Sequence, residues 1–149
     1  MPNELHKATK RKNRLPMIRL QNDIDELFGK RKSLVRSNNQ TTTLSSIYYI
    51  RQLPENAEQI IFLLHAPKKF IKEAHDRNKV KRWMREAIRN NAEFEKIKKI
   101  LLEKNLQTLL LVRADFKPSK DHGWQQIEPD IRMITDYLTK KIQAHSSIA

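Results

Sequence analysis

Hydrophobic residues at helical spacing define the predicted helices of this chain. Apolar side chains recur at intervals of three and four near residues 24–28, over 74–91 and over 127–142, which predicts three amphipathic helices. A similar pattern over 94–101 predicts a helical extension of the second of them. Each of these helices has one apolar face that must be buried against another element.

Extended spacing and unbroken apolar runs predict the strands. Residues 59–65 and 106–113 contain continuous apolar runs, and residues 44–53 are rich in β-branched and aromatic residues. Turn-forming residues at 54–56 separate the predicted strands over 44–53 and 59–65, which predicts that these two strands form a hairpin. The polar segment 30–43 predicts an irregular connection with a short edge strand.

The order of these elements indicates the fold class. Helix, strands, helix, strand and helix follow one another, which predicts an α/β two-layer sandwich with helices covering a small mixed sheet. A chain of 149 residues suits one core, and we expect a single domain over residues 15–149. Residues 1–14 are basic without hydrophobic periodicity, which predicts a flexible arm that either solubilises the protein or wraps RNA.

The helix over residues 74–91 combines two different faces. Its apolar stripe consists of Val80, Trp83, Met84, Ala87 and Ile88. A separate arc of the same helix carries Asn78, Lys81, Arg82, Arg85 and Arg89. Residues 68–89 contain nine lysines and arginines but three acidic residues, so ion pairs within the helix cannot neutralise the row. Arginine presents planar donors that match phosphate oxygens, so this row predicts contact with a sugar-phosphate backbone.

Composition restricts the partners and the compartment. The formal net charge of +13 predicts a polyanionic partner. Cysteine is absent, which excludes disulfides and thiolate metal sites and favours the cytoplasm. No apolar run approaches the roughly 20 residues of a membrane span, and the apolar stripe commits Trp83 to the core, so we expect no membrane partner.

The chain shows no recognisable catalytic motif. A nucleophile elbow, a phosphate-binding glycine loop and a His-Glu-x-x-His run are all missing, and the five histidines are scattered. Hydrolysis of a phosphodiester commonly uses acidic residues that hold two metal ions, whereas most acidic residues here lie among lysines. The nearest cluster, Asp23, Asp25 and Glu26, suits the first turn of a helix. We therefore predict a binding protein with no catalytic or metal-ligating residues of its own.

One motif resembles a known family. It joins a lysine pair to the start of the basic helix as Lys68-Lys69, a short spacer, then Ala74-x-x-Arg77-Asn78-Lys79-Val80-Lys81-Arg82-x-x-Arg85-Glu86. This is similar to the signature of the protein component of bacterial ribonuclease P, and weaker similarities extend over about residues 15–143. The chain departs from the family at Lys79, where a second arginine is usual, at Pro67, where a serine is usual, and at Ile24, where an aromatic residue is usual.

The resemblance implies a four-stranded sheet with a left-handed crossover. It also implies that the protein and an RNA subunit have separate roles. In the family, a catalytic RNA subunit positions the magnesium ions and cleaves the 5′ leader from precursor tRNA, while the protein binds both RNAs. The resemblance implies RNA-binding residues Lys68, Lys69, Arg77, Asn78, Lys79, Lys81, Arg82, Arg85 and Arg89. It also implies a cleft for the single-stranded leader that involves Ile24, Phe28, Tyr48, Tyr49 and Arg113.

Aromatic side chains give the cleft its physical rationale, because bases of any sequence stack on them at about 1–3 kcal/mol each. Strand alternation places Tyr48 and Tyr49 on opposite faces, so only one of them can line the cleft. Phe28 fits a core position as well as a stacking position.

Three other functions compete with this interpretation. A general RNA-binding or ribosome-associated module of similar fold would share the basic helix, and reconstitution with a ribonuclease P RNA separates the two. A nuclease acting without RNA needs converging carboxylates that the sequence does not display. A DNA-binding helix could read base edges through Asn78 and Arg82, but no dimerisation seam is evident, and we expect no DNA partner.

Overall fold

The computed structural model describes residues 14–38 and 42–145, so the predicted basic arm lies outside them except for Arg14. Helices and strands follow one another as α2 (Gln21–Lys30), β1 (Lys32–Asn38), β2 (Thr43–Gln52), β3 (Ile60–His65), α3 (Ala74–Arg89), α4 (Glu93–Lys104), β4 (Leu106–Ala114) and α5 (Trp124–Ala144). The predicted α/β class is confirmed. The predicted element order is wrong in one place, because residues 93–104 form a helix of their own.

The separation of α3 from α4 has a local cause. The Asn90 side-chain amide donates to the Glu86 carbonyl at 2.7 Å, which satisfies a carbonyl near the end of α3. The Asn91 side-chain oxygen then accepts from the Glu93 backbone N–H at 2.9 Å at the start of α4. Two consecutive asparagines thus end one helix and begin the next.

The strands form one mixed sheet in the order β1-β2-β4-β3. Strand β2 is antiparallel to both β1 and β4, while β3 is parallel to β4. The predicted hairpin between β2 and β3 is therefore wrong, because β4 lies between them. The first seven residues of β4, Leu106–Val112, are buried, and a strand that is buried on both faces is stable at the centre of a sheet.

The connection between β2 and β3 leaves room for the central strand. The Leu53 N–H donates to the Asn105 carbonyl at 2.9 Å, and the Thr108 N–H donates to the Gln59 carbonyl at 2.8 Å. These bonds hold the two ends of the connection against the start of β4. The parallel pair β3 and β4 is joined through α3 and α4. The left hand of this crossover stays a prediction.

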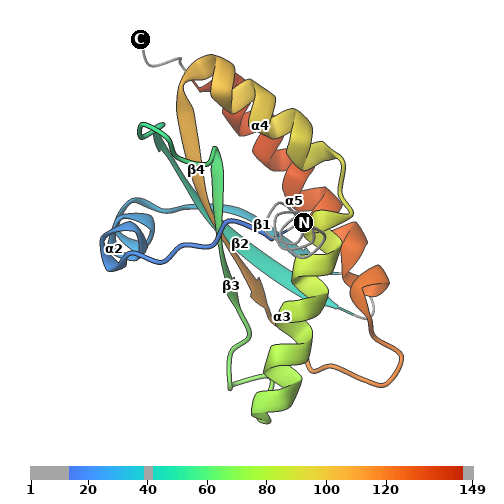
Figure 1. Cartoon of the computed structure of the whole chain (residues 1–149). Helices are drawn as coiled ribbons and strands as arrows, with labels where there is room; N and C mark the ends of the chain where they lie inside the picture. The colour runs from blue at the N-terminus through green and yellow to red at the C-terminus, as the bar shows by residue number, and fades with distance from the viewer. Residues whose placement is uncertain (1–13, 39–41, 146–149) are drawn as a thin grey trace, which may run out of the picture.

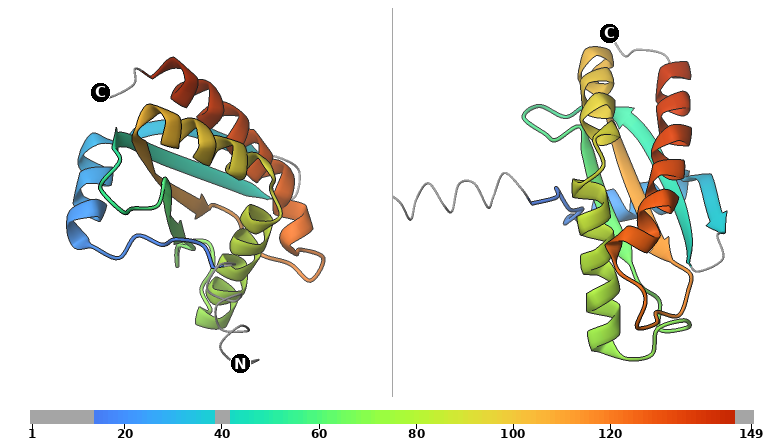
Figure 2. Two further views of the ribbon diagram at one scale, coloured as in Figure 1. Left: turned by 45° about the horizontal axis from the view of Figure 1, so that its top comes forward. Right: turned by 90° about the vertical axis from the view of Figure 1, so that its right-hand side faces the viewer.

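Helices cover both faces of the sheet. Helices α3, α4 and α5 lie on one side and α2 lies on the other, as Figures 1 and 2 show. The larger apolar core lies under the three helices and includes the whole apolar stripe of α3, whose members are at most 7% exposed. The prediction that this stripe faces the core is confirmed. A smaller cluster, which includes Ile18, Leu27, Leu109 and Leu111, lies under α2.

The segment before α2 runs along the edge of β3. The Ile18 N–H donates to the Phe62 carbonyl at 2.8 Å, and the Phe62 N–H donates to the Pro16 carbonyl at 2.9 Å. Met17 forms a parallel bridge with Phe62. This segment pairs with backbone groups at the edge of β3, and it leads the chain from the edge onto the face where α2 packs.

Candidate nucleic-acid interface

Strand alternation places one set of side chains beneath α2. We call this surface the α2 face, and its sheet residues are Ser45, Ile47, Tyr49, Arg51, Ile61, Leu63, His65, Gln107, Leu109, Leu111 and Arg113. Its centre is apolar, whereas Arg51 and Gln107 lie at one end and Arg113 and His65 at the other. Helix α2 packs over the apolar centre through the buried Leu27.

Ion pairs hold α2 to this face. The Arg51 guanidinium lies 2.8 Å from a carboxylate oxygen of Asp23 and 2.8 Å from one of Glu26, and it also donates to the Gln107 side chain at 2.8 Å. Burial acts to lower the pKa of Arg51, but hydrogen bonds and charge from the two carboxylates outweigh it and raise the pKa. The sequence attributed these acids to the first turn of the helix, whereas they are partners of a strand arginine.

The other flank of α2 carries the predicted cleft residues Ile24 and Phe28. Helical spacing turns these two side chains away from Asp23 and Glu26. Ile24 is partly buried against the apolar cluster, while Phe28 is 42% exposed with the Arg31 guanidinium 5.8 Å from its ring centroid. Phe28 is thus a surface aromatic residue and not a core anchor.

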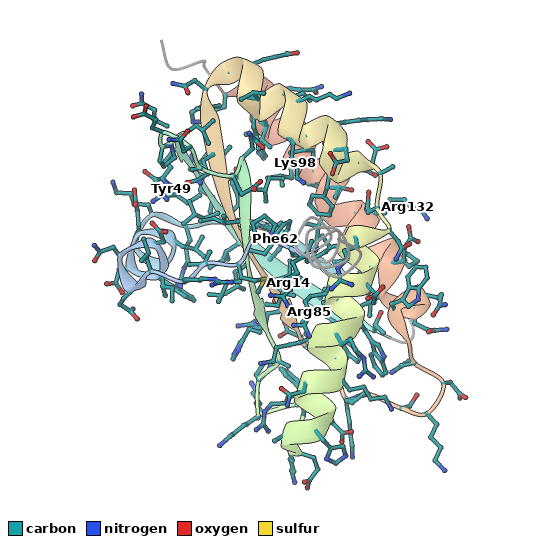
Figure 3. The ribbon with its side chains drawn as sticks, viewed as in Figure 1. Arg14, Tyr49, Phe62, Arg85, Lys98 and Arg132 are labelled. Atoms are coloured by element: carbon teal, nitrogen blue, oxygen red, sulfur yellow. The ribbon has the colours of Figure 1, made fainter. Side chains whose placement is uncertain are left out.

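The two tyrosines lie on opposite faces, as strand alternation predicts. Tyr49 is on the α2 face, where it packs against the small apolar cluster and has the Lys30 ammonium 5.6 Å from its ring centroid. Figure 3 shows Tyr49 on the same side of the sheet as α2. Tyr48 is only 5% exposed within the larger core, and burial raises the pKa of its phenol. Tyr48 therefore does not share a surface with Ile24, Phe28 and Arg113.

A basic corner lies where β3 and β4 end. The Arg113 guanidinium donates to the two carboxylate oxygens of Asp115 at 2.6 and 3.2 Å, and the Ser45 hydroxyl donates to Asp115 at 2.8 Å. The Asp115 side chain is 2% exposed, whereas that of Arg113 is 48% exposed. The buried carboxylate thus orients a guanidinium that still faces solvent. The role of Asp115 could not be predicted from the sequence, because an acidic residue two positions after a strand arginine has no distinctive spacing.

His65 connects this corner to α3. It lies beside Arg113 in the parallel ladder. Burial, followed by the positive charges of Arg113 and Lys81, lowers its pKa, and Asp115 partly opposes the shift. The two cations that lower the pKa of His65 therefore come from the end of the α2 face and from the basic row of α3. His65 is a further residue of this interface that sequence reasoning missed.

The predicted cations of the motif fall into two groups. Some have intramolecular roles: Arg77 donates to the carbonyls of Ile71 and Lys72 at 3.1 and 2.7 Å, Arg89 pairs with Glu86, and Lys79 lies 5.5 Å from the Trp83 ring centroid. Lys69 similarly lies 5.5 Å from the Phe70 ring centroid.

The second group is available to a ligand. Within residues 14–38 and 42–145, the side chains of Arg82, Arg85, Lys68, Asn78 and Lys81 have no hydrogen-bond or ion-pair partner. Figure 3 shows Arg85 projecting from α3. These five residues are the part of the motif that the fold itself does not use.

Metal ligands do not gather in the described part of the chain. No group of three or more histidine, aspartate or glutamate side chains there is arranged so that it could hold a metal ion. Two carboxylates on the α2 side form ion pairs instead, Asp115 with Arg113 and Asp23 with Arg51. Among the described residues, none of the helices has the length and apolar character needed to cross a membrane.

Comparison with known proteins identifies the family. The family model described as Ribonuclease P matches residues 10–137, which include α3 and the α2 face. The chain belongs to the ribonuclease P protein family. A comparison with curated proteins gave no match.

A solved structure of this family shares the fold. The structure of a Staphylococcus aureus RNase P protein mutant with defective mRNA degradation activity has 17% sequence identity and a TM-score of 0.52, with 91% of this chain and 96% of that chain covered. The structure of Staphylococcus aureus RNase P protein has 20% identity and a TM-score of 0.48, with 80% and 92% covered.

Proposed function

We propose that this chain is the protein subunit of ribonuclease P, a ribonucleoprotein endonuclease that removes the 5′ leader from precursor tRNA in the cytoplasm. The family membership carries this proposal. In the proposed enzyme, the protein binds the catalytic RNA and the substrate, while the catalytic RNA holds the magnesium ions that support cleavage.

Helix α3 is the proposed contact with the catalytic RNA. Its apolar stripe is buried, so the helix is rigidly attached and presents its basic row outward. The side chains of Arg82 and Arg85 have no hydrogen-bond or ion-pair partner among the described residues, so no ion pair of theirs has to break when phosphates bind. Lys68, Lys69, Asn78, Lys79, Lys81 and Arg89 extend this contact, and Arg77 shapes the turn that precedes α3.

The α2 face is the proposed site for the single-stranded leader. Phe28 and Tyr49 offer aromatic rings with cations above them, and Arg113 is held toward solvent by Asp115. Rings and cations together suit a single strand without sequence preference, since bases stack while phosphates pair with the cations. Ile24 adds apolar surface, and Tyr48 belongs to the core and not to this site.

A cleavage assay with precursor tRNA tests the proposal. Protein alone, catalytic RNA alone and the two together are incubated with magnesium, at low and physiological salt. We expect no cleavage by the protein alone and a gain in cleavage when it joins the RNA at physiological salt. Binding to many RNAs without any gain in cleavage would instead identify a general RNA-binding module. Cleavage by the protein alone, in a preparation free of contaminating nucleases, would contradict the proposal that the catalytic RNA supports cleavage.

A further inference from the structure

A basic cavity lies at the corner of the sheet farthest from α3. It has a volume of about 400 Å³, within the range of small-ligand sites, and it is formed where α2, β1, β2 and α5 meet. Its lining consists of Lys30, Lys32, Tyr48, Tyr49, Ile50, Lys141, Ala144 and His145. Among the described residues, three lysines line it and no carboxylate does.

Two other cavities in the described part of the chain are closer to neutrality. The cavity beside Arg51 also contains Asp23 and Glu58, and the arginine is already paired there. The cavity between α3 and α4 contains Glu86 and Glu95 beside its cations. The corner cavity differs because its positive charge is not balanced by acidic groups in its lining, and uncompensated lysines around a concave surface favour an anion.

Helix ends account for only part of this charge, because Lys30 and Lys141 lie in the last turns of α2 and α5 whereas Lys32 does not lie in a helix. A cation near the end of α5 would ordinarily stabilise the terminal carbonyls. Here the Lys104 ammonium already performs that task, because it donates to the carbonyls of Gln143 and His145 at 3.1 and 2.7 Å. Lys32 lies at the start of a strand, where no helix end requires it. Lys32 thus has no role at a helix end, and the Lys141 side chain has no hydrogen-bond partner among the described residues.

The cavity is continuous with the α2 face through Tyr49. This residue belongs to the apolar cluster under α2 and also lines the cavity. The register of β1 with β2 begins at Lys32 and Tyr48, whereas β2 continues to Gln52. Among the described residues, the last part of β2 therefore has no strand on its β1 side, and a bound chain could pass around the sheet edge there.

We propose that this corner cavity, which we name the distal site, binds phosphates of the precursor leader farther from the cleavage site than those on the α2 face. The inference rests on the proposed function and extends it. A strand stacked on Tyr49 would displace Lys30 from the ring, so that Lys30, Lys32 and Lys141 are all available to its backbone phosphates. The distal site would then favour long leaders over short ones.

A series of precursor tRNAs whose leaders grow by one nucleotide at a time tests the distal site in the holoenzyme. We expect the affinity of the unmodified protein to rise once the leader reaches the cavity. The double variant Lys32→Gln, Lys141→Gln should lose this rise and should bind short leaders normally. For long leaders, the log-log salt slope should fall by about 1.4 or less, which corresponds to two lost phosphate contacts.

The matched control is Lys96→Gln, Lys99→Gln, which removes two exposed lysines from α4. It should keep the full dependence on leader length. Equal losses at every leader length, or no loss at any length, would overturn the distal site. Normal cleavage of short-leader precursors in the same assay would show that the proposed function still stands.

A lysine-acetylation footprint of the free protein gives a second test of the distal site, and this test does not require ribonuclease P activity. Lysine acetylation is measured with and without a single-stranded oligoribonucleotide, with inorganic phosphate as a second arm. We expect the oligoribonucleotide to protect Lys32 and Lys141 but not Lys96, and phosphate alone to protect them weakly. Unchanged modification of Lys32 and Lys141 at saturating oligoribonucleotide would contradict the distal site, and equal protection by phosphate alone would overturn the assignment to RNA.

Discussion

The Arg51 guanidinium of β2 donates a 2.8 Å hydrogen bond to the Asp23 carboxylate of α2. Both side chains are largely buried, with 17% and 15% of their surfaces exposed. This pair, together with Glu26, fixes the position of α2 on the sheet and with it the position of Phe28. The proposed leader site therefore depends on an ion pair that does not itself face the leader.

Replacing Arg51 with alanine should loosen α2. Asp23 and Glu26 would lose their partner, and Gln107 would lose one hydrogen bond. We expect the free energy of unfolding to fall by about 1–3 kcal/mol, because removing one side of a buried polar pair leaves the other unsatisfied. Chemical denaturation measures this loss. Arg132→Ala is the control, since its pair with Glu128 is exposed and should contribute little.

Alanine at Arg82 or Arg85 should weaken RNA binding without unfolding the protein. Each change should lower the log-log salt slope of binding by about one or less, because one phosphate contact is lost. Arg77→Ala should instead lower thermal stability as well, since Arg77 supports the turn before α3. Filter binding across a salt series and thermal melts distinguish the two classes. If Arg82→Ala reduced stability and left RNA affinity intact, the basic row of α3 would have a role in the fold and not in RNA binding.

Trp83→Ala should act mainly on the fold. Trp83 is 7% exposed and belongs to the larger core, so its truncation should cost about 3–5 kcal/mol. RNA binding should fall only in proportion to the unfolded fraction. Trp83→Phe keeps most of the buried surface and should recover most of the stability. A fully folded Trp83→Ala protein with a selective loss of RNA affinity would indicate instead that the ring contacts RNA.

The two tyrosines should respond in opposite ways. Tyr49→Ala should weaken precursor binding by the holoenzyme by about 1–3 kcal/mol, or about 5- to 150-fold, and leave mature tRNA binding unchanged. Tyr48→Ala should lower stability through a core cavity, with no selective effect on precursors whose leaders are too short to reach the distal site. Tyr49→Phe retains the ring and serves as the control. Equal weakening of precursor and mature tRNA by Tyr49→Ala would contradict the leader site.

His65 should report RNA binding through its pKa. Burial, Arg113 and Lys81 lower this pKa in the free protein, so the folded state resists protonation more than the unfolded chain does. Stability should therefore fall as pH drops below the unfolded value of about 6.5 and stay constant above it. Nearby RNA phosphates should raise the pKa, so RNA affinity should increase as pH falls. Imidazole NMR titrations with and without RNA measure both effects, and an unchanged pKa at RNA saturation would place the RNA elsewhere.

The sequence by itself determined the features that depend on local periodicity. The buried stripe and basic row of α3 follow from 3.6 residues per turn, whatever the helix packs against. The opposite orientations of Tyr48 and Tyr49 follow in the same way from strand alternation. The motif at Lys68–Glu86 was also sufficient to indicate the family, which the match over residues 10–137 confirms.

Only the tertiary structure decided which segments became neighbours. Local patterns are equally compatible with β2 beside β3 or beside β4, and burial on both faces placed β4 at the centre. That arrangement then selected Tyr49 for the α2 face, paired Arg51 with Asp23 and brought Lys141 to the corner beside Lys32. Local periodicity cannot encode these relationships, because each depends on burial and charge contributed by residues far apart in the chain.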